Sequence, residues 1–503
     1  MTPAARLAAA ASVLDSIAQG RAPAEVVIKA WGAANRYAGS GDRRAVAERV
    51  YQVLRARGRL VTAMGGREDG RALVVGALAF LDRLSLEEIE ALHSGEGYGP
   101  RPLSKQERAR IAAGEDDRPG IAADLPPFVV EDLRATFGDR WSEEAAGLMA
   151  RAPVDLRVNT AKTTVEAAQA ELKATGLSPE RTPWSAVGLR LPSEPAPNVQ
   201  ALEAFNAGRV EIQDEGSQLT AWVAGAGLSF TPDSVVIDYC AGGGGKTLAL
   251  AVQGLPAADP TRVAAPSPAG WSPTGADELA AAKSAPAAVP MRLVACDVVQ
   301  KRLDNIRPRL ARAGVAADLR LIGQNGGGVE AFNGKADLVF VDAPCSGSGA
   351  WRRRPEDAWR LKADEIERLH ALQLRILAQA AVLVKPGGRL VYVTCSILSR
   401  ENEAVADAFE ANHKGFHPLP VAGVLAASTL TDAARSRLAG AATGGRLRLS
   451  PASTGTDGFF VALYERRALA GTGPLPVSVR RPPSASWRPS LSTARPFAPA
   501  SVR

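Results

Sequence analysis

Residues 336–349 read ADLVFVDAPCSGSG, and residues 388–396 read GRLVYVTCS. Each stretch contains an apolar run rich in Val and Leu, which is typical of a strand buried on both faces of a parallel sheet. A cysteine follows each run within a few residues, Cys345 in the first stretch and Cys395 in the second. Because the carboxyl ends of parallel strands meet at one rim of a sheet, and that rim carries ligands, we expect both thiols to face one pocket.

Similar runs and helical patterns alternate along the rest of this half of the chain. The other strand-like runs are VVID at 235–238, MRLVAC at 291–296 and ADLRLI at 317–322. Helical patterns begin near Lys246, Val299, Asp364 and Glu401. This alternation predicts an α/β fold, a Rossmann-like and mostly parallel sheet with helices on both faces. No helical pattern follows GFFVALYERR at 458–467, so we expect it to add a late antiparallel strand.

A glycine-rich loop follows the first of these strands. It reads DYCAGGGGKT at 238–247, and glycines let the backbone pass close to a ligand at the carboxyl end of a strand. The second strand ends at Asp297, and an acid there suits the two hydroxyls of a ribose. The two features together predict a nucleoside cofactor site. A glycine-rich turn alone is weak evidence, since NAD enzymes share it, and Cys240 occupies the place where a P-loop needs its first glycine.

Composition limits the classes of protein to consider. The 503 residues are too many for one ordinary core, which favours two or three domains. The 60 Lys and Arg residues against 53 Asp and Glu give a net charge of +7, which permits a polyanionic partner. The sequence contains no run of eighteen apolar residues and no basic start of a secretory signal, so we expect a cytoplasmic protein without a membrane span.

Only four cysteines occur, spaced by dozens of residues. This spacing fits neither a disulfide framework nor a Cys-x-x-Cys metal site, and it is typical of free thiols in a reducing compartment. None of the four histidines falls in a nucleophile or metal pattern, so we expect no metal. We interpret Cys240 and Cys296 as packing residues, with Cys240 beside the cofactor loop.

The domain organisation follows from changes of pattern along the chain. We expect helices packed into a small domain at 1–93, a linker at 94–123, a small α+β module at 124–205, a catalytic domain at 206–467 that contains a disordered insert at about 255–290, and a disordered basic tail at 468–503. The insert and the tail are rich in Ala, Pro and Gly, which cannot bury enough apolar surface to fold.

Two thiols at one rim suit chemistry on a pyrimidine. Cytosine is not nucleophilic at carbon-5, so an enzyme must first add a thiolate to carbon-6, which makes an enamine that can take a methyl group from a sulfonium donor. A base must afterwards remove the carbon-5 proton. Cys345 and Cys395 supply the attacking group and a group to assist elimination, and the neighbouring Asp342 supplies an acid to hydrogen-bond the ring nitrogen. A single cysteine after a strand is more often a small buried hydrophobe, but the pair with its flanking residues favours catalysis.

Six motifs, in this order, make the chain similar to a known family. They are DYCAGGGGKT, DVVQKRL, DAPCSGSG, QLRILAQAAVLVKPGG, TCSILSRENE and GTDGFF. From about Arg157 to Arg467 the chain resembles the Sun-type RNA cytosine-5 methyltransferases, the bacterial ribosomal and eukaryotic nucleolar enzymes with two cysteines. The resemblance implies S-adenosylmethionine as the cofactor. It also implies that Cys395 attacks the base and that Cys345 assists product release.

The same resemblance assigns the cofactor contacts. They fall on Cys240, Ala241, Gly242, Gly243, Gly244, Gly245, Lys246, Asp297, Arg302 and Asp342. Where members often carry an Asp after the third strand to hold adenine, this chain reads GQNG at 323–326, and Asn325 is the candidate substitute. The family's usual AAPGGK is AGGGGK here, which removes no side chain used in chemistry.

Several features point to RNA as the partner. LRVNTAKTT at 156–164 and QDEGSQ at 213–218 resemble the junction between the family's RNA-binding insert and its core, and the first hundred residues resemble a NusB-type RNA-binding domain. Arg352, Arg353 and Arg354 follow Trp351 beside the Cys345 loop, where guanidinium groups can pair with phosphates. We therefore predict RNA contacts by these three arginines.

The resemblance leaves the substrate open. Its domain layout favours small-subunit (16S-type) ribosomal RNA, with tRNA as the alternative, and we expect the enzyme to be a monomer. A DNA or protein methyltransferase is a second reading, but DNA cytosine enzymes attack with the Pro-Cys thiol and lack a cysteine equivalent to Cys395. A third is a non-catalytic RNA-binding factor in ribosome assembly, against which the retained thiols, Asp342 and Lys246 argue.

Overall fold

The apolar runs form one large sheet in the computed structural model, which describes residues 1–113, 120–193, 197–254, 291–425, 430 and 432–468. The strands are β5 (Val235–Asp238), β6 (Arg292–Asp297), β7 (Asp318–Leu321), β8 (Ala336–Asp342), β9 (Val384–Thr394), β10 (Phe416–Leu419), β11 (Ala442–Thr443), β12 (Arg446–Leu449) and β13 (Phe459–Arg466). They follow the order β11-β12-β13-β9-β8-β5-β6-β7, and β10 pairs with β13. Strands β5 to β9 are parallel and β13 runs antiparallel to β9, which confirms the predicted fold class.

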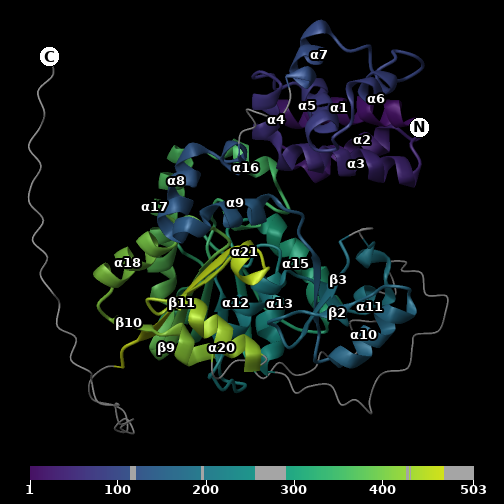
Figure 1. Cartoon of the computed structure of the whole chain (residues 1–503). Coiled ribbons are helices and arrows are strands. Elements are labelled where there is room, and N and C mark those ends of the chain that lie inside the picture. The colour runs from purple at the N-terminus through teal and green to yellow at the C-terminus, as the bar shows by residue number, and fades with distance from the viewer. Residues whose placement is uncertain (114–119, 194–196, 255–290, 426–429, 431, 469–503) are drawn as a thin grey trace, which may run out of the picture. The chain divides into compact units, whose positions relative to one another are not determined.

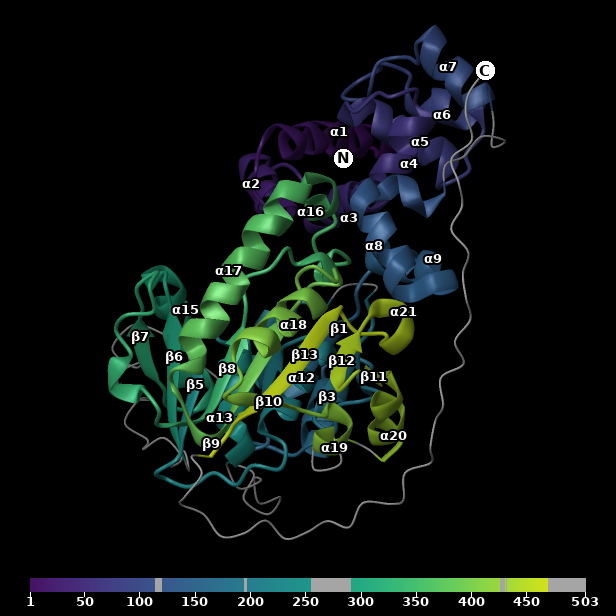
Figure 2. The same ribbon diagram turned by 90° about the vertical axis from the view of Figure 1, so that its left-hand side faces the viewer.

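Helices cover both faces of this sheet. They are α12 (Glu215–Gly225), α13 (Gly245–Ala251), α15 (Gln300–Ala313), α16 (Glu356–Arg360), α17 (Ala363–Ala381), α18 (Glu403–Asn412), α19 (Val421–Leu425), α20 (Asp432–Ala441) and α21 (Pro451–Thr454). Side chains alternate across each strand, so Leu338 of β8 packs into the core that contains α12, α13 and α15. Val339, its neighbour, packs into the core that contains α17 and α18, which lie on the same face of the sheet (Figure 2).

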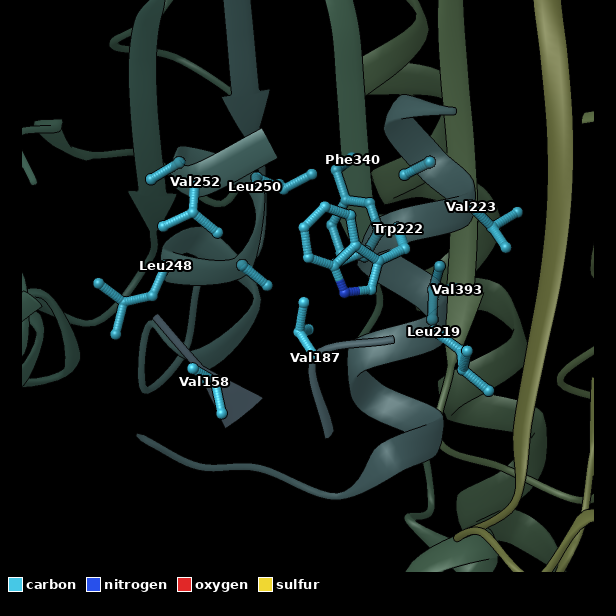
Figure 3. Close-up of a cluster of buried hydrophobic side chains, with 14 of the residues drawn as sticks. Val158, Val187, Leu219, Trp222, Val223, Leu248, Leu250, Val252, Phe340 and Val393 are labelled. Carbon is cyan, nitrogen blue, oxygen red and sulfur yellow. The ribbon is translucent and has the colours of Figure 1, made fainter. Parts of the chain in front are cut away.

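The core beneath α12 and α13 also includes the small module. Figure 3 shows Trp222 of α12 and Phe340 of β8 with the surrounding Leu and Val side chains. Val158 and Val187, which come from the module, belong to the same buried cluster. The module and the catalytic sheet therefore share one hydrophobic core, and residues Met1–Arg467 form one unit of the chain.

The small module is an antiparallel sheet with the strand order β2-β3-β1-β4. Its strands are β1 (Val154–Val158), β2 (Glu180–Arg181), β3 (Gly188–Leu191) and β4 (Val210–Ile212), and its helices are α10 (Val165–Ala174) and α11 (Glu203–Asn206). Strand β4 lies beyond the boundary expected at residue 205. Two further helices, α8 (Pro127–Phe137) and α9 (Trp141–Met149), pack instead on Trp351 and Ile397 of the catalytic part.

The N-terminal part is helical, as predicted (Figure 1). Its helices are α1 (Pro3–Gln19), α2 (Ala24–Ala34), α3 (Ser40–Arg55), α4 (Arg57–Ala63), α5 (Gly70–Phe80), α6 (Leu86–Leu92) and α7 (Lys105–Ala112). Helix α7 lies inside the stretch expected to be a linker, so that expectation is wrong for these residues. A capping box between Ser104 and Glu107 starts the helix, and the Glu107 carboxylate also pairs with Arg71.

Among the described residues, no helix is long and apolar enough to cross a bilayer. The insert expected at 255–290 lies outside these residues, and so does nearly all of the tail expected at 468–503.

Gly208 provides a test of the contact between the module and the catalytic part. Its backbone has φ +70°, and a Cβ there would overlap the carbonyl oxygen of Arg312 at the end of α15. We expect Gly208→Ala to lower the free energy of unfolding by about 1–2 kcal/mol through the left-handed backbone and by a further ~1–3 kcal/mol through the overlap. Gly176 is the matched control, because its φ is +85° and a Cβ there would meet no atom within 4 Å. Equal losses in urea denaturation would contradict this packing.

Candidate active site

The two cysteines follow adjacent parallel strands. Cys345 lies in the loop after β8 and Cys395 directly follows β9, and the register pairs Asp342 with Val393. The two sulfur atoms are 3.3 Å apart, and both side chains are half-buried. The structure thus brings together the two thiols that the sequence predicts at one rim.

A close crossing of two glycines holds the Cys345 loop against neighbouring segments. Gly349 N donates to the carbonyl oxygen of Cys395 at 2.9 Å, and Gly458 N donates to that of Gly349 at 2.8 Å. A Cβ on Gly349 would overlap the backbone of Gly458. The GTDGFF segment therefore packs directly on the Pro-Cys loop. This close approach requires glycine at positions 349 and 458.

One lysine, Lys246, lies among negatively charged groups near the two thiols. Lys246 Nζ lies 2.8 Å from Asp342 Oδ2 and 5.0 Å from the ring centre of Phe459. Burial alone would lower the pKa of Lys246, but the negative charges of Asp342 and Cys395 outweigh it and raise that pKa. The hydrogen bond with Cys395, together with burial, raises the pKa of the Cys345 thiol well above its ordinary value. Lys246 therefore stays protonated at neutral pH and keeps its positive charge beside the predicted catalytic groups.

The glycine loop and Asp297 also lie at this rim. Asp297 is buried, and its two oxygens accept from Gly242 N at 3.1 Å and from Val299 N at 2.8 Å. Arg302 Nη1 lies 3.7 Å from the same carboxylate. Gly244, with φ +79°, is the N-cap residue just before α13. Backbone amides at a helix start, with an acid on the neighbouring strand, suit a nucleoside ligand.

Asp238, which the sequence analysis did not single out, lies beneath this loop. Thr247 Oγ1 donates to its Oδ2 at 2.6 Å, whereas its buried Oδ1 has no hydrogen-bond partner among the described residues. Burial raises the pKa of Asp238 to about 7. Because its side chain is inaccessible to solvent, Asp238 supports the loop through Thr247 rather than facing a ligand. A strand residue that reads simply as the end of VVID carries no separate sequence signal for this role.

The remaining predicted cofactor residues lie nearby or at the surface. Cys240 is half-buried and packs on the core that includes Tyr239 and Val294, in keeping with the packing role assigned to it. Asn325 is exposed, and its Oδ1 accepts from Gly327 N at 3.1 Å within the turn after β7. Within the described ranges, no cluster of His, Cys, Asp and Glu side chains forms a potential metal site.

The arginine triplet differs from the expected exposed run. Trp351 is fully buried, and Arg352 is 5% exposed and lies 3.0 Å from Asp457. Arg353 bridges two buried acids, with Nε 2.6 Å from Asp457 and Nη2 3.0 Å from Asp214. Only Arg354 of the three is exposed, and it lies 3.1 Å from Asp357. Two of the three guanidinium groups are thus engaged in internal ion pairs.

A doubly wound sheet with a glycine loop, an acid after the second strand and two contacting thiols defines an S-adenosylmethionine-dependent methyltransferase of the two-cysteine type. The family described as 16S rRNA methyltransferase RsmB/F matches residues 286–465, and the RsmF/B-like ferredoxin-like domain matches residues 125–197. The ribosomal RNA small subunit methyltransferase B of Xylella fastidiosa is 30% identical over 409 residues, covering 79% of this chain and 84% of the relative. The protein of the same name from Xanthomonas campestris is 29% identical over 403 residues, covering 78% and 80%. The chain belongs to the RsmB/F family of RNA methyltransferases.

Two solved structures share the fold. PH0851 has a TM-score of 0.66 at 22% identity and covers 93% of this chain and 99% of its own. NSun6 from Pyrococcus horikoshii, solved with SFG, has a TM-score of 0.51 at 19% identity and covers 69% and 99%. The first likeness extends over nearly the whole chain, so it includes the helical part as well as the catalytic sheet.

The raised pKa of Asp238 predicts a pH-dependent stability. The unfolded chain releases this proton near pH 3.8, whereas the folded protein holds it up to about pH 7. Stability from Asp238 is therefore complete below pH 3.8 and is lost as the pH rises to 7, by an amount on the order of a few kcal/mol. We expect the melting temperature of Asp238→Asn, relative to wild type, to rise between pH 5 and pH 8. Asp233→Asn, in the exposed turn before β5, is the control, and an Asp238→Asn difference that stays constant with pH would contradict this interpretation.

Proposed function

We propose that this protein methylates carbon-5 of a cytosine in small-subunit (16S-type) ribosomal RNA. The observation that carries the proposal is the 3.3 Å contact between Cys345 and Cys395, beside the cofactor loop. Two thiols in contact suit a reaction in which one sulfur bonds the base and the other assists its release. The names of the relatives refer to small-subunit ribosomal RNA, which favours that substrate over tRNA.

In the first step, the Cys395 thiolate forms a bond to carbon-6 of the cytosine. The electron pair of the carbon-5 to carbon-6 double bond moves onto the ring nitrogen, which takes a proton through the Asp342 carboxyl group and gives it back along the same path when the product forms. When bound, S-adenosylmethionine would supply an electrophilic methyl group to carbon-5, and its sulfonium sulfur would keep the electron pair of the broken bond and leave as S-adenosylhomocysteine. The Lys246 side chain, 2.8 Å from Asp342, fixes the position of this carboxylate during the step.

Release reverses the first bond. The carbon-5 proton leaves, its electron pair rebuilds the carbon-5 to carbon-6 double bond, and the pair of the sulfur to carbon-6 bond returns to Cys395. The raised pKa of Cys345 keeps it a thiol that can donate its proton to the departing sulfur of Cys395, 3.3 Å away, and the thiolate left on Cys345 can then take the carbon-5 proton. Cys345 therefore suits the acceptance of this proton.

The proposal includes a binding surface for the RNA and a cellular location. Of the predicted arginines, Arg354 is exposed, and it stays our candidate for a phosphate contact, with Arg352 and Arg353 holding the loop behind it. Ribosomal RNA as the substrate implies a protein of the cytoplasm. The alternative, a non-catalytic assembly factor, would not require the two thiols to touch.

Covalent trapping tests the roles of the two cysteines. Cys345→Ala should accumulate a denaturant-resistant protein–RNA adduct with cellular RNA and S-adenosylmethionine, because attack continues while release fails. Cys395→Ala should form none, and Cys296→Ala, whose thiol is buried in the core beneath the sheet, is the control that should behave as wild type. An adduct with Cys395→Ala but not with Cys345→Ala would exchange the two roles. Bound RNA without an adduct in any variant would favour the assembly factor.

The cofactor site has its own test. We expect Asp297→Asn to weaken S-adenosylmethionine binding about 10–100-fold, since a hydrogen bond to a charged group contributes roughly 1.5–3 kcal/mol. Asp304→Asn, on the exposed face of α15, is the matched control and should bind as wild type does. Isothermal titration calorimetry measures both dissociation constants. Equal affinities of the two variants for S-adenosylmethionine would contradict a cofactor contact by Asp297.

A further inference from the structure

The two cysteine loops are fastened to one buried carboxylate. Each cysteine is followed by a serine, and the hydroxyls of Ser346 and Ser396 donate to the same oxygen, Glu401 Oε2, at 2.5 and 2.6 Å. Ser346 N and Gln373 Nε2 donate to the other oxygen, Oε1, both at 2.9 Å. Glu401 thus bonds the residue that follows each thiol.

This carboxylate is itself held rigidly. Its side chain is inaccessible to solvent, and a buried carboxylate is tolerated only where donors replace its hydration. Four donors reach the two oxygens here. The main chain of Glu401 is tied back to β9, because the hydroxyl of Tyr392 donates to its carbonyl oxygen at 2.6 Å.

We propose that Glu401 is a positioning residue that sets the spacing of the Cys345 and Cys395 thiols by holding Ser346 and Ser396 on one carboxylate. This inference rests on the proposed function, since spacing matters only where both thiols act on one base. A misplacement of about 1 Å can cost on the order of 10²-fold in rate, so a rigid link between the loops has a large effect on turnover. The Glu401 carboxylate accepts its four hydrogen bonds from serine and glutamine groups, which assigns Glu401 to the support of the thiols rather than to proton transfer with the substrate.

The test replaces Glu401 by Gln, which keeps the shape but turns one acceptor into a donor that faces other donors. The matched control is Glu403→Gln, because Glu403 lies two residues away and pairs with Arg448 rather than with Ser346 or Ser396. We expect Glu401→Gln to lower kcat about 10–100-fold and to leave the KM for S-adenosylmethionine within about twofold. Glu403→Gln should keep the wild-type kcat. A wild-type kcat in folded Glu401→Gln would overturn the inference.

A second measurement needs no RNA and reports the spacing itself. The thiol oxidant diamide should convert Cys345 and Cys395 of the full-length protein into a disulfide, which mass spectrometry of peptides quantifies, and Glu401→Gln should slow this reaction about tenfold. Ser396→Ala removes a single hydroxyl and should slow it as well, which keeps the test available if Glu401→Gln does not fold. Equal rates in wild type and both variants would overturn the positioning role. A wild-type protein that forms the disulfide but methylates no RNA would contradict the proposed function and leave the positioning role standing.

Discussion

The parallel pairing of β8 with β9 is the constraint on which the rest of this structure depends. Because the two strands are parallel neighbours, both end at the same rim of the sheet. The loops that follow them therefore lie side by side, and Cys345 and Cys395 come into contact there. Parallel strands need long crossover connections, and α17 supplies one here while covering the sheet behind the site. The cofactor loop after β5 lies at the same rim because β5 is the other parallel neighbour of β8.

Buried charge then fixes the loops in place. Arg353 joins Asp457 of the GTDGFF segment to Asp214 at the start of α12, and burial raises the pKa of Asp457 to about 7. Breaking one partner of such a pair leaves an uncompensated charge, which is costly. Arg353 directly follows the Cys345 loop, whereas the Glu401 carboxylate bonds Ser346 within that loop. Motifs far apart in the chain are thereby joined around the two thiols.

The sequence predicts the sheet and the meeting of the thiols well, because both follow from local periodicity and from the geometry of parallel strands. It predicts less where the outcome depends on distant partners. Three adjacent arginines look like a surface patch, and only the fold shows that Asp214 and Asp457 neutralise two of them. Glu401 likewise looks like an ordinary helix-start acid. Ser104 and Glu107 form a capping box, a pattern that predicts the start of helix α7. The surrounding Gly and Pro residues favour a linker instead, and the structure shows that the capping box is the better guide.

The most direct measurement is the identity of the methylated nucleoside. Purified protein would be incubated with S-adenosylmethionine labelled in its methyl group and, separately, with unmodified 16S ribosomal RNA and with tRNA, followed by digestion to nucleosides and mass spectrometry. We expect labelled 5-methylcytidine from the ribosomal RNA alone. Label in another nucleoside, or in none despite bound cofactor, would contradict catalysis by the paired thiols, and label from tRNA alone would contradict the ribosomal substrate.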